Sequence, residues 1–219
     1  MSIAASIANN LKTGAVFKRT AVNNTSVSSV TSFAGVSAGA LTLLATQTAS
    51  SSAQLDFTSG IDSTYDAYEF HLNNIHLATD QADVQFQADT GTNTNYNLTV
   101  TNSYFRANHN EDDSASNFSI DAGRDQSQGT GMIQFMSDIT DENDSGNSGI
   151  IRIFGPSSTT SVKHFLGVCN CHHHNPGGDV SRNISIGGYF NTTTAITRFR
   201  FNASSGNIDA GVIKLYGVS

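Results

Sequence analysis

The residues best suited to binding a metal ion gather in one short stretch, Cys169-Asn170-Cys171-His172-His173-His174. Thiolate and imidazole groups together are typical ligands of zinc and iron. If the stretch is a strand, alternation places Cys169, Cys171 and His173 on one side, and His172 and His174 on the other. A tetrahedral site within one chain would then need ligands from elsewhere. The candidates for those ligands are the other histidines of the chain: His71, His76, His109 and His164.

The pair His172 and His174 also predicts a second kind of metal site. In a homotrimer, three such pairs around the symmetry axis would supply six nitrogens to one octahedral transition-metal ion. The plain structural alternative is that the cysteines fill the core and the histidines form a polar turn, which closes on the sequence NPGG at residues 175–178. The sequence leaves these alternatives open.

The two cysteines are too few and too close for a disulfide framework. In a strand the Cα atoms of Cys169 and Cys171 would be about 6.5–7 Å apart, at or beyond the limit for a disulfide. We therefore do not expect a secreted fold held together by disulfides. The N-terminus lacks a basic segment followed by an apolar core, and residues 33–45 are too short and polar to span a membrane. We expect a protein made in a cytoplasm that carries no signal of its own for crossing a membrane.

Residues 141–146 (DENDSG) partly match the start of a calcium-binding loop, with oxygens at alternate positions followed by glycine. The bidentate glutamate that closes such a loop is missing, because Arg152 stands at the twelfth position. We interpret the stretch as an acidic surface turn.

The sequence contains no nucleophile elbow, phosphate-binding loop or zinc-protease helix motif. Paired carboxylates for sugar cleavage remain an open alternative, because the distance between acids in space is not visible in a sequence. Enzymes that depolymerise polysaccharides usually carry a much longer, repetitive β-helix, and this chain shows no internal repeat. We expect a protein that is not an enzyme.

From residue 41 onward, apolar strands alternate with turns rich in Gly, Asn, Asp and Ser, without helical segments between them. In Ile196-Thr197-Arg198-Phe199-Arg200-Phe201 the phenylalanines share one face and the arginines the other, as in a strand with one buried face. We predict an all-β, antiparallel, jelly-roll-like β-sandwich. The predicted strands are residues 41–49, 54–58, 67–75, 82–88, 97–107, 118–121, 131–138, 149–154, 162–172, 184–191, 196–202 and 211–218.

Charge is distributed unevenly along the chain. The first 55 residues contain three cations and no acid, a net charge of +3, and the total of −7 leaves −10 for the rest. We interpret residues 1–44 as an N-terminal anchoring arm, in which residues 2–12 are compatible with a short helix, and residues 45–219 as an acidic sandwich head. An acidic head argues against nucleic acid as its partner. The predicted docking residues of the arm are Ile3, Ile7, Leu11, Lys12, Lys18 and Arg19.

Four stretches of the head are familiar in pattern: AQLDFTSGIDSTYDAY (53–68), VKHF (162–165), GYFNTT (188–193) and above all SSGNIDAGVIKLYG (204–217). They resemble a group of tailed-bacteriophage virion structural proteins. The resemblance covers about residues 45–219 and rests on turn and core patterns, not on catalytic residues. It implies a β-sandwich or jelly-roll head of the fibre or decoration type, exposed on a virion. Residues 1–44 show no such match.

We therefore expect a non-enzymatic virion protein of the short tail-fibre or receptor-binding type, assembled in the host cytoplasm. The expected partners are other virion proteins of the tail or capsid, further copies of the chain in a homotrimer, and a host-surface glycan. Nucleic acid and membrane insertion are not expected, nor is a cofactor, apart from the transition metal at His172 and His174. Two alternatives are a capsid decoration protein or head fibre, and a carbohydrate-binding module whose tyrosines stack on sugars.

Overall fold

The computed structural model of the protein describes residues 40–175 and 178–219, without the side chains of residues 174 and 175. The chain divides into two units, Met1–Ser37 and Ala38–Ser219. The helix suggested for residues 2–12 and the six arm residues predicted to dock lie outside the described residues. The first strand covers residues 41–52, so it takes in residues 41–44, which the sequence-based division assigned to the arm.

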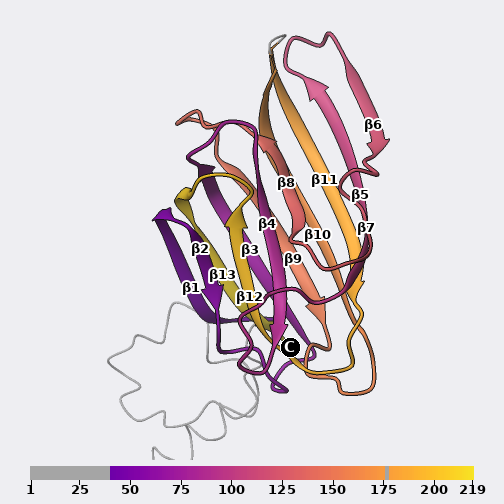
Figure 1. Ribbon diagram of the computed structural model, residues 1–219. Coiled ribbons are helices and arrows are strands. Elements are labelled where there is room, and N and C mark those ends of the chain that lie inside the picture. The colour runs from indigo at the N-terminus through magenta and orange to yellow at the C-terminus, as the bar shows by residue number, and fades with distance from the viewer. Residues whose placement is uncertain (1–39, 176–177) are drawn as a thin grey trace, which may run out of the picture. The chain divides into compact units, whose positions relative to one another are not determined.

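The second unit is built from antiparallel strands (Figure 1). The described residues form no helix long and apolar enough to cross a membrane. The strands are β1 (Leu41–Ser52), β2 (Gln54–Phe57), β3 (Ala67–Leu77), β4 (Ala82–Thr90), β5 (Val100–Asn110), β6 (Ser116–Ile120), β7 (Gln126–Gly129), β8 (Ile133–Ile139), β9 (Asn147–Phe154), β10 (Lys163–Asn175), β11 (Gly178–Phe190), β12 (Ile196–Ala203) and β13 (Ile208–Val218).

Eight of these strands form a jelly roll, which confirms the predicted fold class. The small sheet has the order β2-β12-β4-β8, and one half of the large sheet has the order β1-β13-β3-β9. Successive strands cross between the sheets in the two Greek keys that define this architecture. The described chain begins and ends at one corner, where the Ser219 amide donates a hydrogen bond to the Ala40 carbonyl at 3.2 Å.

The large sheet is longer than the small one because two insertions extend it. Beyond β9 it continues through β10, β11, β5 and β6, and β7 also pairs with β5 (Figure 1). The hairpin of β10 and β11 is inserted between β9 and β12, and β5–β7 are inserted between β4 and β8. We call the strands β10, β11, β5, β6 and β7 the extension.

Phenylalanine side chains fill the space between the two sheets. Phe70 of the large sheet contacts three rings of the small sheet, those of Phe57, Phe199 and Phe201, with ring centroids 4.8–5.2 Å apart. Such edge-on and tilted contacts are the favoured arrangements of aromatic pairs. The buried phenylalanines are Phe57, Phe70, Phe86, Phe135, Phe165, Phe190, Phe199 and Phe201.

At the edge of the small sheet, Phe135 of β8 packs directly on the backbone of the large sheet. The floor beneath its ring is made by Gly149 of β9 and Gly167 of β10. A Cβ atom on Gly149 would lie 2.5 Å from Cys169 Cβ and 2.9 Å from Phe135 Cζ, and one on Gly167 would lie 2.9 Å from Phe135 Cε2. Only residues without a side chain allow this close approach.

Eleven of the twelve predicted strands match observed strands in position, and β11 starts earlier than predicted, at Gly178. Strand β7, Gln126–Gly129, was not predicted, because its residues Gln-Ser-Gln-Gly lack an apolar face. Its pairing with β5 is instead supported by side chains, since the Gln126 amide donates to Asn102 Oδ1 at 3.2 Å.

The glycine floor yields a stability prediction. Gly149→Ala should lower the free energy of unfolding by about 2 kcal/mol, because the new methyl group overlaps atoms that cannot retreat in a packed core. Gly131→Ala is the matched control: no atom lies within 4 Å of its Cβ position, and we expect a change within about 0.5 kcal/mol. Urea denaturation of both variants measures the difference. Equal midpoints for Gly149→Ala and the wild type would contradict this packing.

Candidate functional site

The alternation predicted for residues 169–173 is present in β10. Cys169, Cys171 and His173 are buried between the sheets, whereas His172 is only partly buried. The two sulfur atoms are 3.7 Å apart without a disulfide, and burial raises the pKa of the Cys169 thiol well above its usual value. Both cysteines are therefore core residues. The predicted polar turn is wrong for the histidines, which continue the strand because β10 and β11 pair as far as Asn175 and Gly178.

The other candidate histidines have local neighbours of their own. His71 contacts Glu69 through Nε2 at 2.7 Å, His109 contacts Asp113 at 3.5 Å, and the ring of His164 lies against Tyr189. His76 is 3.3 Å from Asn74 Oδ1. Among the described side chains, none of these four histidines joins His172 in a metal-ligating group.

The trimer-axis site stays a prediction. His172 lies on β10, but the side chain of its proposed partner His174 lies outside the part of the molecule that the structure describes.

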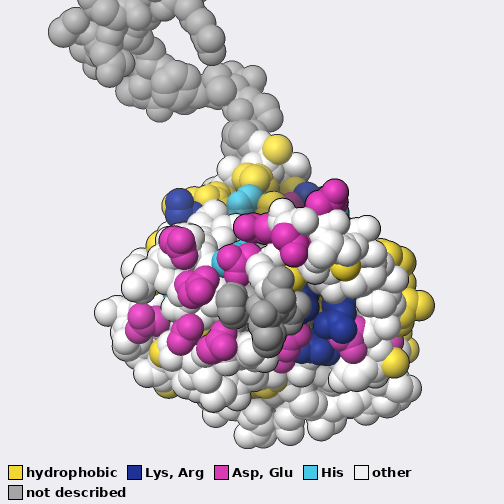
Figure 2. Space-filling view, turned by 90° about the horizontal axis from the view of Figure 1, so that it is seen from above, with side chains coloured by type: hydrophobic (Ala, Val, Ile, Leu, Met, Phe, Trp, Pro, Cys, Tyr) yellow, Lys and Arg dark blue, Asp and Glu magenta, His cyan; other side chains and the backbone are white. Residues whose placement is uncertain are grey.

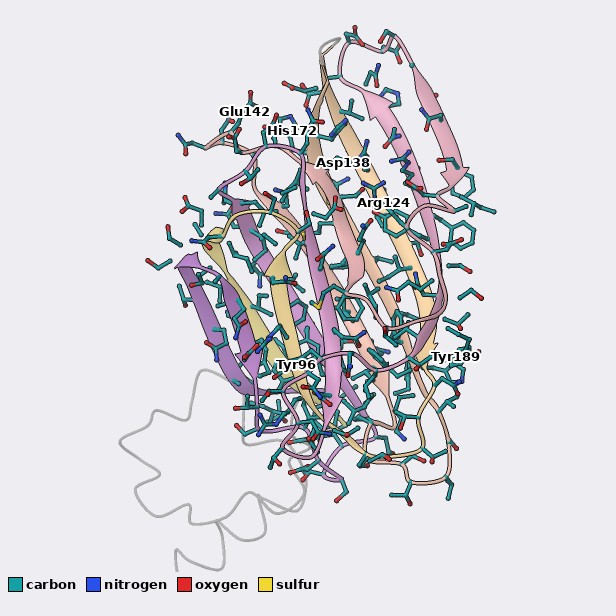
Figure 3. All side chains as sticks on the ribbon, in the orientation of Figure 1. Tyr96, Arg124, Asp138, Glu142, His172 and Tyr189 are labelled. Atoms are coloured by element: carbon teal, nitrogen blue, oxygen red, sulfur yellow. The ribbon has the colours of Figure 1, made fainter. Side chains whose placement is uncertain are left out.

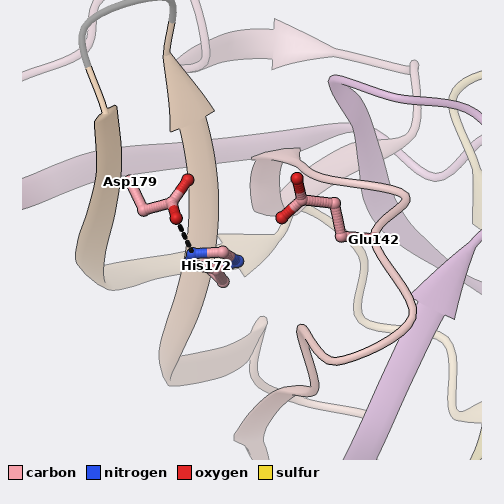
Figure 4. Close-up of side chains that lie close together, drawn as sticks. All are labelled: Glu142, His172 and Asp179. Carbon is pink, nitrogen blue, oxygen red and sulfur yellow. Dashed lines mark ion pairs between the residues drawn. The ribbon is translucent and has the colours of Figure 1, made fainter.

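The structure instead brings His172 together with two acids. Glu142 comes from the turn after β8, His172 from β10 and Asp179 from β11 (Figure 4). One ligand atom from each residue lies within 4.8 Å of those of the other two, and His172 Nε2 is 3.7 Å from Asp179 Oδ2. We call Glu142, His172 and Asp179 the acid–histidine group.

Glu142 belongs to the acidic turn that partly matches a calcium loop. Asp141, Asn143 and Asp144 of this turn are exposed, as expected for an acidic surface turn. Ser145 is buried, and both its amide and its hydroxyl donate hydrogen bonds to the Glu142 carbonyl. This turn and the histidine stretch are separate features of the sequence, and the fold places them side by side.

A network of charged side chains fills the space where the small sheet ends and the large sheet continues. Asp138 of β8 is its centre: it accepts hydrogen bonds from Arg124 Nη2 at 2.6 Å and from Arg182 Nη1 at 2.7 Å. Figure 3 shows Arg124 and Asp138 toward the end of the sandwich that also holds Glu142 and His172. The members of this network are Asp83, Asp121, Asp138, Arg106, Arg124 and Arg182.

Sequence reasoning missed this network, because its members are spread from β4 to β11 and no local motif unites them. Arg182 is only 4% exposed and also donates to the Ser137 carbonyl, so its charge is paired and hydrogen-bonded inside the protein. Burial raises the pKa of Asp83 despite its contact with Arg124. The network pairs three acids with three bases, and this pairing offsets the desolvation free energy of burying the charges. Its role is structural: it fixes β8 against the extension.

The large sheet has an outer face, turned away from the small sheet, and a strip of apolar side chains lies exposed on it. Ile150 and Phe154 of β9 are 38% and 37% exposed, and Leu166 and Val168 of β10 are 57% and 53% exposed. Val168 pairs with Ile150 across the two strands, so the strip is continuous. We call these four residues the outer strip. An open depression runs along it, bordered by Glu69 and Arg152.

Charged groups of both signs border the outer strip. Arg152 Nε donates to Glu69 Oε1 at 2.7 Å, and His71 Nε2 lies 2.7 Å from Glu69 Oε2. Burial alone would raise the pKa of Glu69, but the hydrogen bonds from His71 and Arg152 outweigh it and lower that pKa. Glu69 is therefore held as a carboxylate between β3 and β9.

Comparison with known proteins gave no support for or against these sites: no protein-family model, curated protein or solved structure matches the chain.

The lowered pKa of Glu69 predicts a pH-dependent contribution to stability. Its folded pKa lies below its unfolded value, so the contribution is present above the unfolded pKa, near 4.5, and is lost as pH falls through the folded pKa. Glu69→Gln should lower the free energy of unfolding by about 1 kcal/mol at pH 7. Below the folded pKa, variant and wild type should be equally stable.

Urea denaturation between pH 3 and pH 7 measures this effect. Glu111→Gln, at an exposed glutamate, is the control and should match the wild type throughout. A Glu69→Gln defect of the same size at both ends of the pH range would show that lost packing, not the ion pair, causes it.

Proposed function

We propose that this protein is a non-enzymatic structural protein of a phage virion, of the short tail-fibre or receptor-binding type. Residues 1–44 attach it to another virion protein, and the sandwich is the exposed head. The observation that carries the proposal is the outer strip, four exposed apolar side chains at the centre of the outer face of the large sheet.

The architecture supports this proposal by analogy. Jelly rolls recur in viral capsid and lectin domains, although a fold alone does not fix a function. The virion resemblance of residues 45–219 points the same way, and its strongest stretch, residues 204–217, covers β13 and the turn before it. In the jelly roll, β13 lies between β1 and β3.

The occupant of the outer strip is a second copy of this chain. Contiguous exposed apolar side chains mark interaction surfaces in soluble proteins. The bordering charges include an acid, Glu69, and a base, Arg152, so the surface can complement another copy of itself. Association through the centre of the large sheet leaves the loops at the ends of the sandwich free to contact other partners.

The tyrosines give less support to the alternative of a carbohydrate-binding module. Tyr68, Tyr96 and Tyr104 are buried, and Tyr65 packs edge-on against Tyr68. Tyr216 lies against His71. Tyr68, Tyr96 and Tyr104 therefore pack within the sandwich, and the partly buried rings of Tyr65 and Tyr216 each lie against a neighbouring ring.

Substituting Leu166 tests the outer strip. Leu166→Asp should raise the dissociation constant of the oligomer by about 100-fold or more, because association would bury an unpaired carboxylate. Ile120→Asp is the matched control: Ile120 is 63% exposed on β6, at the far edge of the same sheet, and its substitution should leave association unchanged. Sedimentation equilibrium distinguishes the two. A monomeric wild type, or a Leu166→Asp variant that still associates, would contradict association through the outer strip.

Removing residues 1–39 tests the anchoring role and leaves β1 whole. The truncated protein should fold and associate but should be absent from purified particles. Quantitative mass spectrometry of particles that carry the full chain gives its copy number. Tens of copies that copurify with tails support a fibre, whereas hundreds on tail-less heads would identify a capsid decoration protein. Truncated protein that still joins particles would contradict anchoring by the arm.

A further inference from the structure

We propose that Glu142, His172 and Asp179 bind one divalent transition-metal ion within a single chain, and that zinc fits this site best. The inference does not rest on the proposed function, because all three ligands belong to one copy of the sandwich.

The backbone of His172 fixes both ends of the turn that carries Glu142. The amide of Thr140, at the start of the turn, donates to the His172 carbonyl at 3.3 Å. The amide of His172 donates to Oδ1 of Asn147, at the end of the turn, at 2.9 Å. Asn147 is fully buried, and its Nδ2 donates to the Ile75 carbonyl at 2.9 Å. Glu142 is therefore held beside the histidine by contacts that do not involve either ligand side chain.

The turn itself is closed by hydrogen bonds. The amide of Glu142 donates to Thr140 Oγ1 at 3.2 Å, and the Ser145 hydroxyl donates to the Glu142 carbonyl at 3.0 Å. Thr140 and Ser145 are 2% and 4% exposed, so this part of the turn is locked into the sandwich. Only the carboxylate of Glu142 needs to be ordered when an ion binds, which lowers the entropic cost of binding.

Asp179 is positioned by the pairing of β10 with β11. His172 pairs with Ser181 and Cys171 with Arg182. Arg182 is anchored to Asp138 in the charge network, so the hairpin cannot slide relative to β8. The Asp179 carbonyl also accepts a hydrogen bond from the Glu111 amide at 2.9 Å. The three ligands thus come from three elements whose relative positions are fixed.

The distances suit a small cation after a modest side-chain adjustment. In a tetrahedral zinc site with bonds of about 2.0–2.1 Å, neighbouring ligand atoms are about 3.3 Å apart. His172 Nε2 and Asp179 Oδ2 are already 3.7 Å apart, and one ligand atom of each of the three residues lies within 4.8 Å of those of the other two. Three protein ligands leave a fourth position for water. Among the described residues the buried Nδ1 of His172 has no hydrogen-bond partner.

The ligand set decides between classes of metal. Calcium and magnesium prefer sites made only of oxygen, whereas one imidazole with two carboxylates suits zinc and related transition metals. The surroundings favour any cation, because Asp and Glu side chains gather around a histidine at this end of the sandwich (Figure 2). By binding all three side chains, the ion would cross-link the turn after β8 to the β10–β11 hairpin.

Zinc titration of the untagged full chain, stripped of metal by a chelator, tests the site. The wild type should bind one Zn²⁺ per chain in isothermal titration calorimetry, and zinc should raise its Tm by several degrees. His172→Ala and Glu142→Gln should each weaken Zn²⁺ binding by about tenfold or more. Glu142 is exposed, so its substitution should leave the metal-free Tm unchanged. The matched control is His109→Ala, which removes an exposed histidine with a single acidic neighbour, Asp113, and should leave affinity unchanged.

Three results would overturn the inference. One is the absence of saturable Zn²⁺ binding, and another is wild-type affinity in Glu142→Gln. The third is a stoichiometry of one ion per three chains, lost in the Leu166→Asp variant, which would point to the trimer axis. One ion per chain in a monomeric Leu166→Asp variant would support the site even if the proposed association failed.

Discussion

Contact between phenylalanine rings across the two sheets is the interaction on which the rest of the structure depends. Phe70 of the large sheet meets Phe57, Phe199 and Phe201 of the small sheet, so one side chain links β3 to two strands of the other layer. At the edge, where β8 is the last strand of the small sheet, Phe135 rests on a floor of glycine. Burial of large apolar rings supplies most of the favourable free energy of such a sandwich.

The two sheets differ in width, and the wider large sheet must be held in place beyond the edge of the small sheet by something other than ring packing. Among the described residues, no strand of the small sheet lies beyond β8 to cover the rest of the extension, and apolar packing gives way there to paired charges around Asp138. A buried ion pair contributes little net stability, but breaking one leaves an uncompensated charge and is costly. The network therefore selects one position of the extension over alternatives. The geometry of Glu142, His172 and Asp179 depends on that position, since His172 and Asp179 lie on the hairpin it holds.

Sequence reasoning succeeded where one face of a strand is apolar and failed where both faces are polar. Phe199 and Phe201 alternate with arginines, and the strand they predict is present as β12. The start of β11, residues 178–183, escaped prediction because Val180 is its only buried apolar residue and the other buried residue, Arg182, serves the charge network. Likewise, the sequence marked Glu142 and His172 separately. Their proximity depends on hydrogen bonds from Thr140 and to Asn147, which no local pattern encodes.

Strand β10 contributes residues both to the outer strip and to the acid–histidine group. Leu166 and Val168 of the outer strip lie in its middle, whereas His172 lies near its end, and β10 is paired on both sides. The sequence from residue 56 onward carries a net charge of −10, so copies of the head repel one another. Two acids, Glu142 and Asp179, lie beside His172, and the outer strip is bordered instead by the paired charges of Glu69 and Arg152. Because the acids beside His172 lie away from the outer strip, electrostatic repulsion between two copies that associate through the strip is reduced.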